Sequence, residues 1–314
     1  MDSLHFQRWT RIGTMNCSSP REEALFSSSR KLEPPDVGCY GISIVLAAML
    51  FVFIAGGAES ISPGTVQLFN GTNLAGWYSW LVDTKRDDPR RVFAVTNGLL
   101  RISGDGLGYL ATTQEYSDYR LSVEFKWGAT HWPWADRIGK ASDSGLFLHS
   151  VGPDGNSHDG RGAFRAAIEC QIMQGATGDL LLIRGTNTDG SLIAPRVSVA
   201  VQPGRDAEGW PFVAFTDSRE TLDIERWGRV NWLNKSRQWK DEFDFRGPRD
   251  VERPRGQWNE LICICERDHI LVQLNGVTVN EARGVFPRRG KILLQCEGSE
   301  VFFRRVTLEP MTHR

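Results

Sequence analysis

The sequence lacks a large net charge, a zinc-type cysteine pattern and a dinucleotide-binding motif. Its 37 basic and 38 acidic residues give a formal net charge of −1, so no nucleic-acid partner or anionic membrane surface is expected from overall charge. The six cysteines include no Cys-x-x-Cys pair, which argues against a structural zinc site. No glycine-rich fingerprint follows a strand and opens a helix, so the chain is not expected to bind a nicotinamide cofactor.

Disulfide bonds are also poorly supported. Cys263 and Cys265 lie two residues apart in an alternating segment and point the same way, so they are not expected to bridge each other. Together with Cys170 and Cys296 they occupy apolar positions. Buried free thiols are the expected state, and one or two disulfides are the alternative that an oxidising compartment permits.

A sustained helical period is missing after residue 61, and short alternating runs with turn residues take its place. Asn97-Gly98 and Asn275-Gly276 lie between such runs and are typical of tight hairpin turns. In residues 119–127, YRLSVEFKW, apolar and polar side chains alternate. About a dozen strands without crossover helices predict an all-β fold, a sandwich or jelly roll of two antiparallel sheets.

The first 58 residues differ from the rest. Residues 1–40 are rich in Ser, Arg and Glu and are expected to be a disordered leader. Residues 41–58, GISIVLAAMLFVFIAGGA, contain no charge and are expected to form a hydrophobic helix that acts as a cleaved export signal. The alternatives are an uncleaved membrane anchor and a buried core helix. The domain at 61–314 is therefore expected to be exported, to be periplasmic or secreted, or to be anchored to the membrane by this segment.

The most informative stretch is residues 144–179. If residues 167–172 form a strand, Glu169 and Gln171 share one face while the apolar residues between them share the other. A carboxylate and a carboxamide on so apolar a strand are costly unless they meet solvent, each other or a ligand. His149 and Phe147 share a face of the preceding run. We predict a polar patch on the open face of a sheet.

Other strands and one loop are expected to add to this patch. Glu124 and Lys126 lie on the polar side of residues 119–127, with an exposed ion pair as the alternative role. Asp143 and Asp179 lie at strand ends, and Asp179 follows a glycine that favours a turn. Further candidates are Gln295 and Glu297 on one strand, and Trp132 and Trp134 in a loop as a wall for sugar stacking.

An ordered series of segments carries a family resemblance. LFNGTNLAGW, YRLSVEFKW, SGLFLHS, IECQIMQGATGDL, GQWNELIC, LNGVTVNEA and GKILLQCEGSEVFFRRVTLEP resemble the 3-keto-disaccharide hydrolase domain family over residues 65–310. Segment 185–257 matches least. The resemblance implies a concanavalin A-like jelly roll that cleaves the glycosidic bond of a sugar carrying a ketone at carbon 3. The ketone acidifies the C2 proton, a base removes it, the enolate expels the C1 substituent, and water then adds.

Such chemistry needs a base, stabilisation of the enolate oxygen and an acid. We predict catalytic roles for Glu169, His149, Glu124 and Lys126, and substrate-binding roles for Gln171, Trp132, Trp134, Asp179 and Glu297. A divalent metal ion held by carboxylate, amide and imidazole groups is a candidate for the enolate. The expected partners are a carbohydrate substrate and a separate sugar 3-oxidoreductase upstream.

The same residues bear on two alternative functions. A non-catalytic carbohydrate-binding jelly roll would use the aromatic loop to hold unoxidised glycans. An ordinary two-carboxylate glucanase is disfavoured. Asp223 and Glu225 resemble the acidic residues of a retaining-glucanase strand, but Thr221 occupies the position of that strand's first carboxylate.

Overall fold

A computed structural model describes residues 64–209, 211–216, 220–226 and 228–311. The predicted leader at 1–40 and the apolar segment at 41–58 lie outside these residues. No helix in the described ranges has the length and apolar character needed to cross a membrane. Their only helical element besides turns is the short 3₁₀ helix η2 (Pro133–Ala135).

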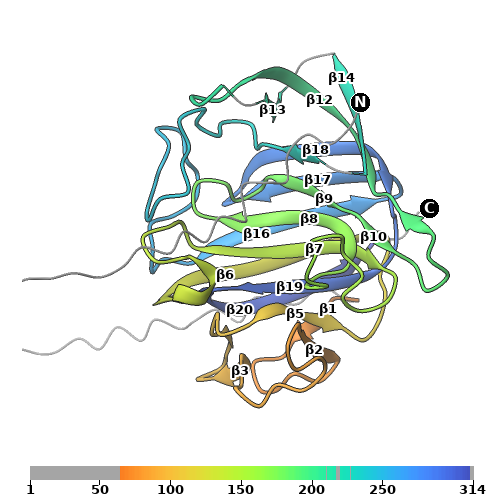
Figure 1. Cartoon of the computed structure of the whole chain (residues 1–314), viewed down its shortest axis with the longest axis vertical. Helices are drawn as coiled ribbons and strands as arrows, with labels where there is room; N and C mark the ends of the chain where they lie inside the picture. The colour runs from red at the N-terminus through yellow and green to blue at the C-terminus, as the bar shows by residue number, and fades with distance from the viewer. Residues whose placement is uncertain (1–63, 210, 217–219, 227, 312–314) are drawn as a thin grey trace, which may run out of the picture. The chain divides into compact units, whose positions relative to one another are not determined.

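The described strands form two large antiparallel sheets (Figure 1). The larger has 11 described strands in the order β13-β12-β18-β17-β16-β6-β20-β4-β3, with β1 beside β20 and β14 beside β12. Its strands are β1 (Val66–Phe69), β3 (Phe93–Thr96), β4 (Leu99–Ile102), β6 (Tyr119–His131), β12 (Arg196–Arg205), β13 (Pro211–Phe215), β14 (Thr221–Glu225), β16 (Asn259–Glu266), β17 (His269–Leu274), β18 (Val277–Phe286) and β20 (Ser299–Pro310).

The smaller sheet has seven described strands in the order β15-β9-β8-β7-β19-β5-β2. They are β2 (Trp77–Leu81), β5 (Leu107–Thr112), β7 (Asp143–Val151), β8 (Ala166–Met173), β9 (Leu180–Ile183), β15 (Gly228–Val230) and β19 (Lys291–Glu297). A separate hairpin pairs β10 (Gly185–Thr186) with β11 (Leu192–Ile193). Figure 1 shows β8, β7 and β19 running side by side in the middle of the smaller sheet.

The core lies between the two sheets. Val123 and Phe125 of the larger sheet belong to the same buried cluster as Leu146, Ile168 and Leu294 of the smaller one. These are the apolar positions of the alternating runs, so their burial removes one face of each sheet from water. The described cysteines are free and buried, as expected. The all-β jelly-roll prediction is confirmed.

Both hairpin turns that the sequence predicts are present. Asn97-Gly98 joins β3 to β4 and Asn275-Gly276 joins β17 to β18, with positive φ at all four residues. This conformation suits asparagine and glycine and matches the right-handed twist of paired strands.

A single residue carries the chain from the smaller sheet to the larger one. β19 ends at Glu297 and β20 begins at Ser299, so the crossing is made at Gly298, whose φ is +78°. A Cβ atom there would lie 2.2 Å from the Cβ of Ala135 and 2.9 Å from Cγ of Arg137. Glycine is therefore required both by the backbone angle and by the close packing of the loop around η2.

The long segment 185–257 is tied to the core by a buried carboxyl group. Glu252 is 3% exposed. Its Oε1 accepts from the indole N–H of Trp127 at 2.7 Å, and its Oε2 lies 2.9 Å from the hydroxyl of Thr177, which also donates to the carbonyl of Met173. Burial, followed by weaker effects that include the Asp250 carboxylate, raises the pKa of Glu252 to about 7.

We expect Glu252→Gln to make the protein less sensitive to alkaline pH. Because the folded-state pKa is raised from 4.5 to about 7, the contribution of Glu252 to stability is complete below pH 4.5 and is lost as pH rises through 7. Glutamine mimics the protonated acid, so the variant should gain about 2–3 kcal/mol over wild type between pH 5 and pH 8.5. Urea unfolding at both pH values measures this, with Glu242→Gln as the exposed control; equal pH dependence in all three proteins would contradict it.

Candidate functional site

Three neighbouring strands place acidic and amide side chains on the face of the smaller sheet that points away from the core, here called the open face. On β8, Glu169 and Gln171 lie opposite Phe147 and Gly145 of β7. On β19, Gln295 and Glu297 alternate with the core residues Leu294 and Cys296. Asp143 begins β7 and shares the parity of Gly145. We call Asp143, Glu169, Gln171, Gln295 and Glu297 the carboxylate cluster.

Gly145 lies in the middle of this cluster because no larger residue fits there. A Cβ atom on it would be 2.3 Å from Oε1 of Glu169 and 2.9 Å from Oε1 of Gln295. The two side chains therefore lean over Gly145 from the strands on either side. The missing side chain brings Glu169 and Gln295 toward each other over bare backbone.

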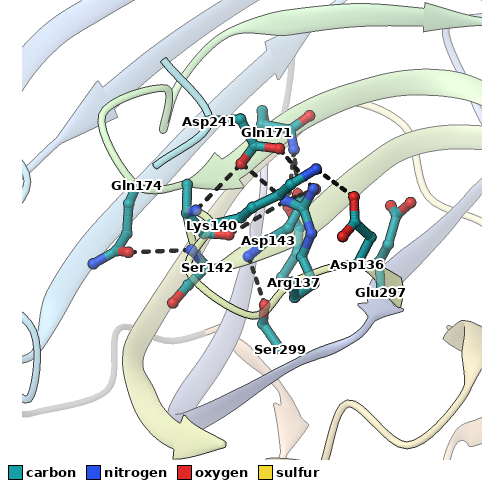
Figure 2. Close-up of polar contacts among 12 residues, drawn as sticks. Asp136, Arg137, Lys140, Ser142, Asp143, Gln171, Gln174, Asp241, Glu297 and Ser299 are labelled. Atoms are coloured by element: carbon teal, nitrogen blue, oxygen red, sulfur yellow. Dashed lines mark hydrogen bonds and ion pairs between the residues drawn. The ribbon is translucent and has the colours of Figure 1, made fainter. Parts of the chain in front are cut away.

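A buried arginine organises one end of the cluster (Figure 2). Arg137 comes from the loop after β6 and is 1% exposed. Its guanidinium contacts Asp143 at 3.3 Å and pairs with both carboxylate oxygens of Asp241 at 3.2 and 2.7 Å. Asp143 also accepts from the amide of Gln171 at 2.7 Å. Figure 2 shows Glu297 next to this network on the adjacent strand.

Three carboxyl groups of the cluster have pKa values raised above those of isolated carboxyl groups, which are about 4. Burial raises the pKa of Asp143 to about 6 despite the opposing charge of Arg137. Burial and then the charge of Asp143 raise the pKa of Glu297 to about 8. Burial and the charges of Asp143 and Glu297 raise the pKa of Glu169 well above its ordinary value. Such displaced titrations are typical of groups that transfer protons.

Two oxygen atoms of the cluster have no hydrogen-bond partner among the described residues. They are Oε1 of Glu169 and Oε1 of Gln295, and each side chain is only 3% exposed. A buried polar atom without a partner costs free energy unless a ligand or water supplies one. Both atoms lie over Gly145, so this is the place where a bound molecule would gain most.

The cluster differs from a preformed metal centre. Within the described residues, no three His, Cys, Asp or Glu side chains gather in a way that would hold a metal ion. The Asp143 carboxylate is already used by Arg137 and Gln171.

The rest of the open face is closed on one side by apolar packing. Phe147, Leu293 and Tyr109 on the sheet form a second buried cluster with Ala163 and Phe164 from the loop before β8. Phe147 and Phe164 pack with ring centroids 5.4 Å apart. This apolar packing covers the face beside the carboxylate cluster, whose residues Glu169 and Asp143 are themselves buried.

Two predicted catalytic residues lie in a different place. Glu124 and Lys126 are on β6 of the larger sheet, with their side chains pointing away from the core. Glu124 pairs with Arg304 at 2.8 Å, and the Lys126 ammonium lies 5.0 Å from the ring of Trp258. The prediction that they join Glu169 is wrong, because the core separates the two faces.

His149 also points away from the cluster. The pairing of β7 with β8 shifts between Leu148 and Val151, and His149 has a φ of +52°. This bulge turns the ring into the interior, 5.5 Å from the ring of Tyr119, with Nδ1 3.0 Å from the carbonyl of Pro287. Burial lowers the pKa of His149 to about 4, so the ring is neutral. The prediction that it shares the face of Phe147 is wrong.

The remaining predicted residues fall into two groups. Glu169, Gln171 and Glu297 come together in the cluster. Asp179 directly precedes β9 and is fully buried. Arg229 and Lys235 both bind its Oδ2 at 2.6 Å. Trp132 donates its indole N–H to the carbonyl of Ser103, and Trp134 is 43% exposed next to it; their role in sugar stacking stays a prediction.

Sequence reasoning missed the charged residues around the cluster. Arg137 stands in a loop without periodicity, Arg229 follows 58 residues after Gln171, and Asp241 lies farther along the same irregular segment. Only the three-dimensional pairing of β15 with β9 and the folding of the loop onto β7 bring them to the site. A buried arginine in a polar loop gives no local signal in the sequence.

Comparisons with known proteins identify the family to which the chain belongs. A family model described as a 3-keto-alpha-glucoside-1,2-lyase-like domain matches residues 64–309. A search of curated proteins found no match. A proposed glycosyl hydrolase from Parabacteroides distasonis ATCC 8503 is similar in structure, with a TM-score of 0.43, 15% identity, and coverage of 79% of this chain and 94% of that chain.

Two further solved structures show weaker likeness. The carbohydrate-binding module CBM66 from Bacillus subtilis has a TM-score of 0.38 and 13% identity, covering 74% of this chain and 95% of its own. A beta-glucanase from Bacillus licheniformis has a TM-score of 0.38 and 10% identity, covering 80% and 100%.

Proposed function

Since the chain belongs to the 3-keto-alpha-glucoside-1,2-lyase-like family, we propose that it cleaves the glycosidic bond of a sugar carrying a ketone at C3. The observation that supports this most is the unpartnered, buried Oε1 of Glu169 over Gly145. A desolvated carboxylate is a strong base, as removal of a proton next to a ketone requires.

Gln295 separates the two carboxyl groups that we assign as base and acid. It lies between Glu169 and Glu297, and its Nε2 donates to Oε2 of Glu297 at 2.9 Å while its Oε1 faces Gly145. With a pKa of about 8, Glu297 carries a proton at neutral pH and can donate it. When Glu297 is protonated, a half-turn of the Gln295 amide lets its oxygen accept that proton's hydrogen bond, so Gln295 is compatible with Glu297 as the acid. We assign Glu169 as the base because its unpartnered oxygen lies on the other side of Gly145.

The reaction then balances with groups of this chain. Glu169 takes the C2 proton, and the electrons of the C2–H bond form the enolate. The enolate expels the C1 oxygen substituent, which takes its proton from Glu297. Water adds to the resulting double bond to complete hydrolysis and restores both carboxyl groups to their starting states. Arg137 and Arg229 supply the positive charge near the cluster that favours the enolate oxygen.

A direct assay tests the proposal. The protein is incubated with a 3-keto-glucoside and with the unoxidised glucoside, and the release of the aglycone is followed with and without an added divalent metal ion. We expect release only from the keto sugar. No release under either metal condition would reject the proposal, and binding of the unoxidised glycan without turnover would favour a carbohydrate-binding module.

We expect the rate to fall at alkaline pH. Glu297 must be protonated to act as the acid, and its pKa is about 8. Because Glu169 must be ionised and its pKa is raised too, kcat/KM should rise with pH as Glu169 loses its proton and should decline above about pH 8 as Glu297 loses its own. Glu297→Gln should be slower at pH 7 and should lose this alkaline limb. If kcat/KM of Glu297→Gln still declines above about pH 8, the titration belongs to another group.

We expect Gly145→Ala to reduce turnover while the protein stays folded. The new Cβ displaces the flexible ends of Glu169 and Gln295, which move at little cost to the fold. A shift of about 1 Å in a reacting group lowers the rate by roughly 10²-fold. Steady-state kinetics and a melting curve measure the two effects; wild-type kinetics would mean that neither side chain acts in the reaction.

The proposed substrate implies a separate supplier. Oxidation of a C3 hydroxyl group to a ketone needs a hydride acceptor, and the sequence carries no dinucleotide fingerprint. A separate sugar 3-oxidoreductase therefore comes first in the reaction sequence. The apolar segment at 41–58 supports the proposal that the cleavage takes place outside the cytoplasm, in an exported or membrane-anchored protein.

A further inference from the structure

A hollow of about 450 Å³ lies next to β15 and is lined by no member of the carboxylate cluster. It is bounded by β13, β14 and β15 and by the segment after β15. Three cationic side chains line it, together with one carboxylate and one indole ring: Arg229, Lys235, Arg237, Asp206 and Trp239. The lining is therefore more basic than the chain as a whole, whose formal charge is −1.

The cations are only partly neutralised. Arg229 and Lys235 both bind Oδ2 of Asp179, each at 2.6 Å. Nη2 of Arg229 is buried and has no acceptor among the described residues. The Arg237 side chain is exposed and donates to the carbonyl of Arg205 at 3.3 Å. A second acceptor for Arg229 would have to come from water or a ligand, because a buried N–H without one is costly.

The hollow is connected to the base by the register of the smaller sheet. Arg229 of β15 lies opposite Leu181 of β9, and Leu181 lies opposite Glu169 of β8. Two strand spacings separate Arg229 from Glu169, which is about 10 Å between backbones. This distance matches the length of a disaccharide, so a ligand that occupied the hollow and also reached Glu169 would need at least two sugar units.

Trp239 provides a wall for a sugar ring next to the cations. The indole N–H donates to the carbonyl of Gln174 at 2.9 Å, which fixes the ring. The Lys235 ammonium lies 4.5 Å and the Arg229 guanidinium 5.8 Å from its centroid. An aromatic face beside positive charge suits a sugar that carries an anionic group.

We propose that this hollow binds the acidic sugar unit attached at the bond to be cleaved, through a carboxylate or sulfate group held by Arg229, Lys235 and Arg237. This rests on the proposed function, since the bond is defined by the reaction at Glu169. It makes acidic glycosides the preferred substrates of the site. Burial and the charge of Arg229 lower the pKa of Lys235 to about 7, and a bound anion would restore its proton.

Binding measurements on unoxidised sugars test the hollow without requiring turnover. Isothermal titration at constant ionic strength compares a disaccharide containing glucuronate, its sulfated counterpart and the neutral glucose disaccharide. We expect an acidic disaccharide to bind at least tenfold more tightly than the neutral one. Arg237→Gln and Arg229→Gln should each remove most of this preference, while the exposed control Arg289→Gln keeps it.

Each outcome of these binding measurements either supports or overturns the proposed binding of an acidic sugar. Preference for only the carboxylate or only the sulfate form identifies the anionic group and supports the hollow. Equal binding of acidic and neutral sugars overturns it, as does an equal loss in the control variant. If free sodium sulfate competes as well as the sulfated sugar, the site holds an adventitious ion only and the proposal fails. Arg237 is exposed, so its variant stays informative if Arg229→Gln fails to fold.

The proposed function and the hollow fail in different ways. Acidic disaccharides that bind while no 3-keto glycoside is cleaved would reject the reaction and keep the hollow. Cleavage of neutral 3-keto disaccharides with the same kcat/KM as acidic ones would reject the hollow and keep the reaction.

Discussion

Glu169→Gln is expected to lower kcat for cleavage of a 3-keto-glucoside by about 10³-fold, because glutamine cannot accept the C2 proton. The amide keeps the shape of the side chain, so KM should change little. The variant should be at least as stable as wild type at neutral pH, since the pKa of Glu169 is raised well above its ordinary value and glutamine needs no ionisation. Steady-state kinetics and thermal melting measure both parts.

Glu124→Gln is the matched control. It makes the same chemical change on the outward face of the larger sheet, where Glu124 pairs with Arg304. Its kcat should equal that of wild type. A Glu169→Gln variant with more than a tenth of wild-type kcat would remove Glu169 from the proton transfer.

The second large effect concerns the fold. Arg137→Met should destabilise the protein by about 3–5 kcal/mol, because it leaves Asp143 and Asp241 without the buried cation that both contact. Methionine keeps much of the volume, so the loss reflects charge rather than packing. Urea unfolding at pH 8 measures it, since Asp143 has a pKa of about 6 and is ionised there.

Two further variants separate the causes. Adding Asp143→Asn to Arg137→Met removes one stranded charge and should recover part of the stability. Arg304→Met breaks an ion pair in which the arginine is 44% exposed and should cost less than about 1 kcal/mol. If the double variant is no more stable than Arg137→Met alone, the arginine acts by packing instead.

The core and the polar face of β8 were predictable from the sequence because both depend on a period of two. Leu121, Val123, Ile168 and Ile172 are buried between the sheets as the alternation predicts. The same rule placed Glu169 and Gln171 together. Local alternation decides which residues of one strand share a face, and it is independent of the rest of the fold.

Alternation does not tell which sheet a strand joins. β6 and β8 carry similar patterns, but β6 pairs with β16 and β20 in the larger sheet. Glu124 and Lys126 therefore face solvent on the opposite side of the molecule from Glu169. The choice of sheet depends on long-range pairing, which one sequence without its partners does not show.

His149 shows the other limit of the rule. A single extra residue in β7 breaks the period at that point and reverses the faces of the residues that follow. The sequence SGLFLHS gives no sign of this, since the positive φ falls on a histidine rather than on a glycine. Arg137 and Lys235 escaped prediction because loops bring them to the sheet, and Arg229 because it reaches the sheet through the long-range pairing of β15 with β9.

The tightly packed crossing at Gly298 restricts the position of the neighbouring Glu297. The proposed acid is the last residue of one layer, and the next layer starts two positions later. Ala135 and Arg137 press against the glycine between them, so this junction leaves no room for adjustment. The proposed acid thus stands next to a tightly packed turn, whereas the irregular chain from 185 to 257 has a smaller share of its residues in regular strands, where a substitution would disturb pairing.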